Sequence, residues 1–144
     1  MAEVFQNPSD QVIKNYLEEG KTIAVVGLSD RQDTAAFRVA QFLQEKGYHI
    51  VPVNPKCEGQ LLLGQKVYAH LQDIPYPIDI VDVFRRSEAL PQVAKDFLEI
   101  DAKVFWAQLG LESEEAAFLL TSAGRHHIVM DRCIKIDYQN LLEK

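Results

Sequence analysis

Glycines are missing where a dinucleotide-binding loop needs them. The apolar run 22–28 is followed by a polar loop, yet Gly27 is the only glycine there, and neither G-x-G-x-x-G nor G-x-x-x-x-G-K-[ST] occurs. An NAD site also uses an Asp or Glu after the second strand, where this chain has Asn54. The loop is therefore neither an NAD fingerprint nor a P-loop, although Gly27 and a helix N-terminus together suit a phosphate.

The chain is also poor in cysteine, in long apolar runs and in net positive charge. Cys57 and Cys133 are too few and too far apart for a disulfide framework or a metal pattern. No apolar run approaches about 18 residues, and the net charge of −6 argues against nucleic acid as the main partner. We expect a soluble, cytoplasmic protein with no membrane segment and no metal site, forming one domain over residues 1–144.

Apolar runs alternate with helical patterns along the chain. Strands are expected at 22–28, 49–53, 79–84, 103–109 and 127–130, and helices at 10–19, 34–46, 87–100, 113–123 and 134–142, with Ser9, Ser87 and Ser113 as caps. This alternation predicts a Rossmann-like three-layer α/β fold with a five-stranded parallel sheet, in the strand order 3-2-1-4-5. The first helix, within residues 1–20, is expected to pack on this core.

In such sheets ligands bind outside the carboxyl ends of the strands, so the residues that follow each strand are the informative ones. After the first strand, Gly27 and Ser29 could hold a phosphate, with Arg38 reaching it from the next helix. The alternative is a plain strand–helix turn with a solvated Arg38. Arg85 and Arg86 follow the third strand. The alternative to a ligand contact there is that one arginine is solvated and the other pairs with a carboxylate such as Asp82. Trp106, within the fourth strand, is expected in the core.

Five blocks of sequence, in order, resemble the stand-alone CoA-binding proteins. The blocks are "IAVVGLS", "RVAQFLQEKGYHIVPVNP", "LGQKVYAHLQDIPYPIDIVDVFRR", "WAQLG" and "MDRC", and the similarity covers about residues 22–138. That family is similar to the CoA-binding domain of the succinyl-CoA synthetase α-subunit. The resemblance implies a Rossmann-like sheet that binds coenzyme A, or an acyl-CoA, along its carboxyl edge.

The resemblance also implies a set of ligand-binding residues at that edge, with Asp131 and Arg132 closing the site. The predicted set is Gly27, Leu28, Ser29, Arg38, Val53, Asn54, Pro55, Lys56, Val83, Phe84, Arg85, Gln108, Leu109, Gly110 and Cys133. The loop 30–36 departs from the family, in which many members carry prolines and serines there. Its two carboxylates would face a polyanion unless Asp33 caps the helix and Asp30 pairs with Arg31.

No catalytic constellation is apparent in the sequence, with no nucleophile elbow and no Ser-His-Asp grouping. We therefore expect a non-catalytic binding or regulatory module whose partner is the small molecule CoA. Two alternatives stay open. One is an enzyme acting on a CoA thioester or another nucleotide substrate through Cys133, Arg132 or Asp131. The other is an interaction protein whose cleft is vestigial.

Overall fold

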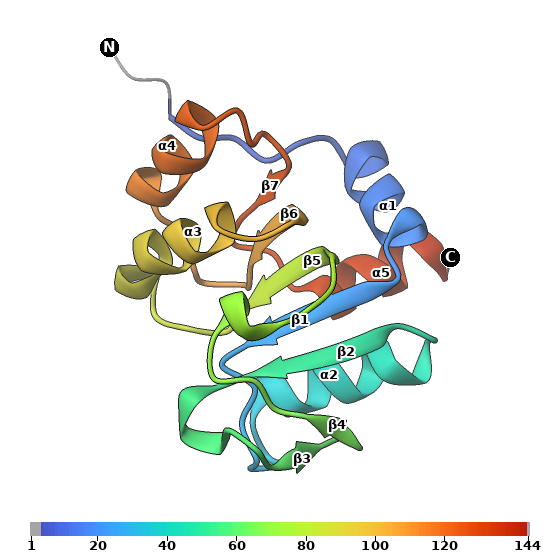
Figure 1. Ribbon diagram of the computed structural model, residues 1–144. Coiled ribbons are helices and arrows are strands. Elements are labelled where there is room, and N and C mark those ends of the chain that lie inside the picture. Colours follow the sequence, from blue (N-terminus) through green and yellow to red (C-terminus); the bar gives the residue numbers. More distant parts are fainter. Residues whose placement is uncertain (1–3, 144) are drawn as a thin grey trace.

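The computed structural model describes residues 4–143, and its centre is a parallel sheet (Figure 1). The strands are β1 (Thr22–Val26), β2 (His49–Val53), β5 (Ile78–Val83), β6 (Ala102–Ala107) and β7 (Ile128–Val129). They lie in the order β2-β1-β5-β6-β7, and every neighbouring pair is parallel. The expected α/β fold with a five-stranded parallel sheet is thus confirmed.

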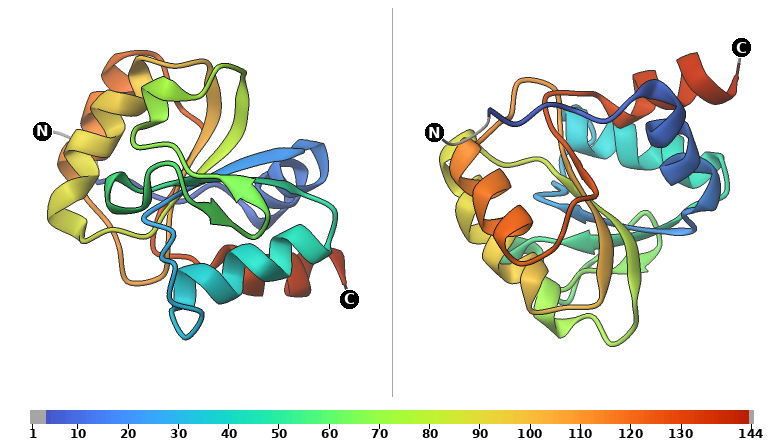
Figure 2. Two further views of the ribbon diagram at one scale, coloured as in Figure 1. Left: turned by 60° about the horizontal axis from the view of Figure 1, so that its bottom comes forward. Right: turned by 90° about the horizontal axis from the view of Figure 1, so that it is seen from above.

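Helices cover both faces of this sheet (Figure 2). They are α1 (Asp10–Glu19), α2 (Ala35–Glu45), α3 (Leu90–Leu98), α4 (Glu114–Ser122) and α5 (Ile134–Leu142). On one face, α1, α2 and α5 bury apolar side chains against Val25, Ile80 and Trp106. On the other, α3 and α4 pack against Val81 and Phe105. Strands buried on both faces read as continuous apolar runs, which is why β1 and β5 could be found from the sequence.

The predicted strand order is wrong. Numbered along the chain, the five main strands lie in the order 2-1-3-4-5, because β5 pairs with β1 and not with β2. The place beside β2 is taken by the irregular segment between the two strands. Tyr68 forms a parallel bridge with Val53, donates its N–H to the Pro52 carbonyl and accepts one from Asn54. With that edge occupied, the next long strand crosses to the other side of β1.

The segment that carries Tyr68 has no long helix. It contains a short antiparallel hairpin, β3 (Leu61–Leu62) with β4 (Gln65–Lys66), and two single 3₁₀ turns, η1 (Pro55–Cys57) and η2 (Leu71–Asp73). The edge of the sheet beside β2 is therefore built from turns and one bridge.

Two of the three serines that were predicted as helix N-caps have this role in the structure. The hydroxyls of Ser9 and Ser113 accept the N–H groups of Val12 and Ala116. The prediction for Ser87 is wrong: residues 87–89 form a 3₁₀ turn, η3, and α3 begins at Leu90 with Pro91 in its first turn. Proline suits the first turn of a helix because it has no N–H to leave unpaired.

The first helix packs on the sheet. Ile13, Tyr16 and Leu17 are buried from α1, and the Tyr16 hydroxyl lies 3.0 Å from His127 Nδ1. Trp106 is fully buried, as predicted, and donates its indole N–H to the Arg132 carbonyl at 2.9 Å. Within residues 4–143, no helix is long and apolar enough to cross a membrane.

Candidate functional site

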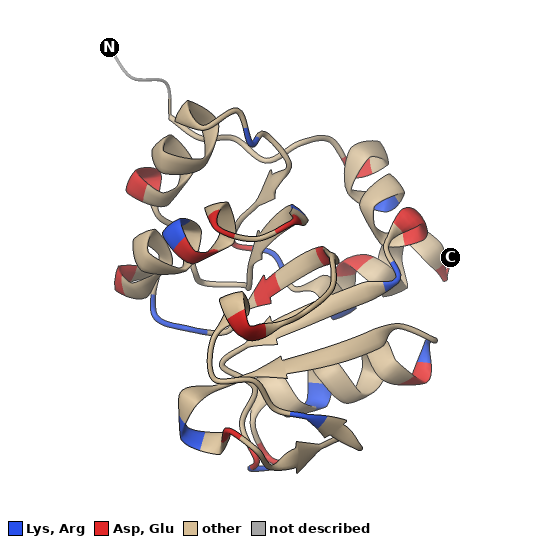
Figure 3. Cartoon of the chain, in the orientation of Figure 1, with Lys and Arg blue, Asp and Glu red and all other residues tan. Residues whose placement is uncertain are grey.

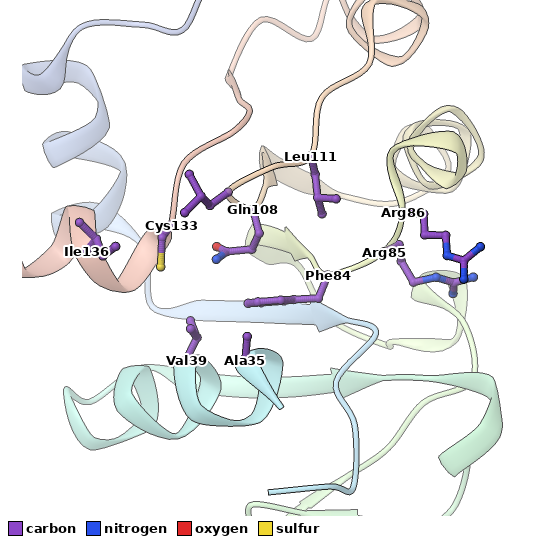
Figure 4. Close-up of a pocket in the computed structure, with 10 residues that line it drawn as sticks. Ala35, Val39, Phe84, Arg85, Arg86, Gln108, Leu111, Cys133 and Ile136 are labelled. Atoms are coloured by element: carbon purple, nitrogen blue, oxygen red, sulfur yellow. The ribbon is translucent and has the colours of Figure 1, made fainter. Parts of the chain in front are cut away.

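A pocket of about 650 Å³ opens at the carboxyl edge of the sheet, between α2, α5 and the loops after β5 and β6 (Figure 4). Most of the pocket wall is apolar, and the two cationic side chains, Arg85 and Arg86, lie together at one side. It is lined by Ala35, Val39, Phe84, Arg85, Arg86, Gln108, Leu109, Leu111, Cys133 and Ile136. Clefts at this edge of a parallel sheet are where open α/β folds bind ligands.

The floor of the pocket follows from strand register. The last residues of β1, β5 and β6, which are Val26, Val83 and Ala107, are paired with one another. The residues that follow them, Gly27, Phe84 and Gln108, therefore form the next row. Phe84 donates its N–H to the Val26 carbonyl at 2.8 Å. The Phe84 ring lies along the floor of the pocket, facing Ala35 and Val39 of α2 (Figure 4).

Gly27 has a structural reason to be glycine. Its φ is +92°, and a Cβ at this position would lie 2.3 Å from the Phe84 carbonyl oxygen. The close approach that glycine permits is therefore between the ends of β1 and β5. The sequence interpretation assigned that approach to a ligand phosphate, whereas the structure assigns it to a neighbouring strand.

Backbone groups of the first loop are hydrogen-bonded to the end of β2 and to the loop that follows it. Gly27 donates its N–H to the Val53 carbonyl at 2.8 Å, and Asn54 Nδ2 donates to the Leu28 carbonyl at 3.0 Å. Asn54 Oδ1 accepts the N–H of Lys56 at 3.0 Å, so both ends of this amide are used. Leu28 itself is fully buried. Asn54 thus joins the loops that follow β1 and β2.

Ser29 and Arg38 are also engaged locally. Ser29 Oγ accepts the N–H of Arg31 at 3.0 Å, and Arg38 Nη2 donates to the Asp33 carbonyl at 2.9 Å. Neither residue lines the pocket. The predicted pairing of Asp30 with Arg31 is wrong, because Arg31 pairs with Asp33 at 3.1 Å. The predicted helix cap at Asp33 is wrong as well: the cap of α2 is Thr34, whose hydroxyl accepts the Phe37 N–H.

Arg85 and Arg86 are exposed, and neither forms an ion pair or a side-chain hydrogen bond within residues 4–143. They mark the loop between β5 and α3 in blue (Figure 3). Both also line a second, more polar hollow of about 570 Å³, together with Glu88 and Ala89. The two guanidinium groups therefore stand between an apolar pocket and a polar hollow. Arginine in this state suits a phosphate, because its planar fork can bind two oxygens at once.

Asp82 does not pair with either arginine, contrary to the alternative drawn from the sequence. It lies two rows below Phe84 in β5, between Val25 and Trp106, and is fully buried. Neither carboxylate oxygen has a hydrogen-bond partner among the described residues. Burial raises the pKa of the Asp82 carboxyl well above its ordinary value, because the low-dielectric interior disfavours the charged form.

Gln108 is the polar side chain on the pocket floor, and it is only 5% exposed. Its Oε1 accepts the N–H of Ile134, the first residue of α5, at 3.1 Å. Its backbone N–H reaches the Val83 carbonyl at 3.2 Å. The side chain of Gln108 therefore connects the end of β6 to the start of α5.

Of the three residues considered for catalysis, the pocket includes one. Cys133, half-buried at the start of α5, lines the pocket. Arg132 is held by both oxygens of Asp137, at 2.8 Å each, and by Asp10. Asp131 Oδ1 accepts the Gly110 N–H at 2.7 Å. Asp131 and Arg132 thus fasten the loop before α5.

The pocket contains part of the predicted binding set. Phe84, Arg85, Gln108, Leu109 and Cys133 line it, while the other predicted residues lie in the first loop, in α2, in the loops after β2 and β6 or at strand ends. Sequence reasoning missed five lining residues: Ala35, Val39, Arg86, Leu111 and Ile136. Arg86 and Leu111 could have been found, because they follow predicted strands. The other three lie in the first two turns of α2 and α5, and which side of a helix meets a cleft depends on packing.

This pocket and sheet define a member of a known class: the chain belongs to the family described as CoA binding domain, which it matches over residues 21–139. It is 53% identical over 131 residues to protein YneT of Bacillus subtilis (strain 168), covering 91% of this chain and 95% of that protein. A Thermus thermophilus structure, cell-free ID.343, superimposes with a TM-score of 0.89 at 36% identity, covering 94% of this chain and 100% of that one.

A larger enzyme shares the fold. The structure of Ca. Korarchaeum cryptofilum dinucleotide-forming acetyl-coenzyme A synthetase 1 aligns with a TM-score of 0.62 at 23% identity. The alignment covers 77% of this chain but 26% of the synthetase. At this level of identity the likeness is one of fold.

Proposed function

We propose that this chain binds coenzyme A or an acyl-CoA at the carboxyl edge of its sheet, as a binding or regulatory module. The observation that carries the proposal is the apolar pocket beside two arginines that have no ion-pair partner among the described residues, in a chain of the CoA-binding family. Coenzyme A joins an uncharged arm, in which short aliphatic segments separate two amides, to a nucleotide through a diphosphate. An apolar pocket, two adjacent guanidinium groups and a polar hollow provide the matching surfaces in the same order.

The net charge of the whole chain does not exclude this ligand, because a small anion needs only a local site. Coenzyme A carries roughly four negative charges on its diphosphate and 3′-phosphate, and the chain has a net charge of −6. Acidic and basic residues are interspersed over the molecule (Figure 3), so binding depends on the local pair Arg85 and Arg86.

The pocket supports binding better than catalysis. Within residues 4–143, the lining side chains of the pocket include no imidazole, carboxylate or hydroxyl that could act as a general base for Cys133.

NAD is a poorer ligand than CoA for the same edge. Gly27 has no accompanying glycines, and the Asn54 side chain, where an NAD site has its acid, is already bonded to Leu28 and Lys56.

The proposal is tested by native mass spectrometry of the purified protein, followed by calorimetric titration with CoA, acetyl-CoA and NAD. We expect CoA or an acyl-CoA to co-purify or to bind, and NAD to bind more weakly. NAD binding more tightly than CoA would reverse the assignment of ligand. Failure of all three to bind would favour the vestigial cleft, and turnover of an acyl-CoA would favour the enzyme.

We also propose a cytoplasmic location. Cys57 and Cys133 are both free thiols, a state that a reducing compartment maintains. Recovery of the native protein in a membrane or secreted fraction after cell fractionation would contradict this location.

A further inference from the structure

Asp82 lies beneath the floor of the pocket. It is paired in register with Val25 of β1 and Trp106 of β6, and this row of side chains faces α1, α2 and α5. Phe84 comes two residues later on β5, so its side chain leaves the same face of the sheet about 7 Å further along the strand. The Phe84 ring lies along the pocket floor (Figure 4). A single row of side chains, which includes Phe84, therefore separates the Asp82 carboxyl from the pocket.

The environment of the Asp82 carboxyl favours its protonated form. The side chain is fully buried, and neither oxygen has a hydrogen-bond partner among the described residues. An unpaired carboxylate is far more costly to bury in an apolar layer than a protonated carboxyl. Burial accordingly raises the pKa of Asp82. When the pH rises through that folded value, a charge forms in the core without a partner from residues 4–143.

The other ionisable groups on this face do not stabilise an Asp82 carboxylate. None of those in the same apolar layer forms a hydrogen bond with Asp82; they are Tyr16, Tyr48, Cys57, Cys133 and Tyr138. Asp79 and Lys103 lie near the opposite ends of β5 and β6. The charged residues of the covering helices are exposed or half-buried, except one that is bonded to Arg132; they are Asp10, Lys14, Glu18, Glu19, Arg38, Glu45, Lys135 and the buried Asp137.

Phe84 is the neighbour of Asp82 that is free to move. Trp106 is fully buried, and its indole N–H is bonded to a backbone carbonyl. Gln108, in the same row as Phe84, is nearly buried and bonded to the start of α5. Phe84 is half-buried, its ring has no polar atom, and it borders a pocket of about 650 Å³. Exposing one half-buried ring costs less than burying an unpaired charge, so the ring yields first.

We propose that Asp82 and Phe84 form a proton-linked gate in the floor of the pocket. While Asp82 is protonated, the ring lies along the floor as in Figure 4. When the proton leaves to solvent, the ring turns into the pocket, and water from the pocket reaches the carboxylate. A ring in that position occupies ligand space, so proton loss weakens binding, and binding promotes proton uptake because linkage is reciprocal. The effect on binding rests on the proposed function, whereas the gate itself does not.

Trp106 provides the measurement, because it is the only tryptophan in the chain and lies beside Asp82 in the sheet. Acrylamide quenching of its fluorescence is followed from about pH 5 to about pH 10, with circular dichroism to show that the fold persists. In the parent we expect quenching to rise about twofold or more through one transition, as water and quencher enter beneath Phe84. Asp82→Asn has the same shape and no ionisable proton, so it should keep the low value throughout.

Asp101→Asn is the matched control for this titration. Asp101 is exposed and lies just before β6, at the end of the strand away from the pocket, and the chemical change is the same. It should retain the transition of the parent. Phe84→Ala keeps the test valid if Asp82→Asn fails to fold. Because it removes the ring, quenching should be high already at about pH 5 and should show no transition.

Calorimetric titration with CoA tests the link to binding. Above the transition, the affinity of the parent relative to Asp82→Asn should fall by up to about tenfold per pH unit. Near the midpoint, the parent should take up protons on binding, which is measured by comparing buffers of different ionisation enthalpy. A pH dependence of affinity that is the same in both proteins would overturn the link between the gate and the ligand.

Two results would overturn the gate itself. One is the absence of a quenching transition in the parent, and the other is a transition that Asp82→Asn retains in full. Failure of the proposed function is a different result, in which the parent binds no CoA at any pH while the Trp106 transition is still observed.

Discussion

Two pairs of loops meet at the same edge of the sheet and use their polar groups in opposite ways. The loops after β1 and β2 direct theirs inward, through Gly27 to Val53 and Asn54 to Leu28. The loops after β5 and β6 leave Arg85, Arg86 and Gln108 Nε2 without partners within residues 4–143. Residue type alone therefore does not identify a ligand contact. What matters is whether the group is still available once the fold has formed.

The largest effect is expected at Gly27, where the first pair of loops contacts β5. Gly27→Ala should lower the free energy of unfolding by about 3 kcal/mol or more, because strain at positive φ adds to the clash with the Phe84 carbonyl. Gly47→Ala is the matched control: φ is +101° there and nothing lies within 4 Å of the added Cβ, so about 1–2 kcal/mol is expected. Equal losses in urea unfolding would mean that the ends of β1 and β5 can separate.

The next effect concerns Asp82, beneath the second pair of loops. Its pKa is raised in the fold above the ordinary 3.8, so as pH rises from about 4 toward the folded value, ionisation of the unfolded chain lowers stability. Asp82→Asn should remove this part of the pH dependence. Asp82→Val, which removes the unpaired polar atoms, should raise the free energy of unfolding at pH 7 by about 1–3 kcal/mol.

Urea unfolding at pH 5 and pH 8 measures both effects at Asp82. If Asp82→Asn retains the full pH dependence of the parent, another group is responsible. If Asp82→Val is less stable than the parent at pH 7, the carboxyl has a partner in solution, and a ligand or a water that reaches it becomes the next question.

The arginines test the comparison directly through CoA affinity. Arg85→Ala and Arg86→Ala should each weaken CoA about tenfold or more, because a charge-assisted contact to phosphate is lost. Arg38→Ala should change affinity by less than about twofold, since Arg38 is exposed and bonded to the Asp33 carbonyl. A loss at Arg38 as large as at Arg85 would show that the first loop does contact the phosphates, as the sequence predicts.

The smallest effect is a change in reactivity at Cys133. Cys133 lines the pocket and is partly exposed, whereas Cys57 is buried in η1, so iodoacetamide should modify Cys133 first. CoA at about ten times its dissociation constant should slow this modification about tenfold, since only the free protein reacts. Peptide mass spectrometry distinguishes the two thiols. A rate unchanged by saturating CoA would place the ligand outside the part of the pocket that includes Cys133.

The sequence by itself determined the local structure of this protein. The apolar runs of β1, β2 and β5, the caps at Ser9 and Ser113, and the helix from 134 to 142 were all predictable, because they depend on neighbours a few residues away. The edge of the sheet that bears the pocket followed as well, since parallel strands bring all their carboxyl ends to one side.

Only the tertiary structure decided the strand order and the free groups at that edge. Tyr68 takes the place beside β2 through a single bridge, and a bridge of one residue has no sequence pattern. Gly27 faces a strand, Asn54 joins two loops and Arg38 reaches a carbonyl, whereas Arg85 and Gln108 Nε2 remain open. Each of these outcomes depends on atoms brought together from distant parts of the chain, and local propensity does not encode which of them meet.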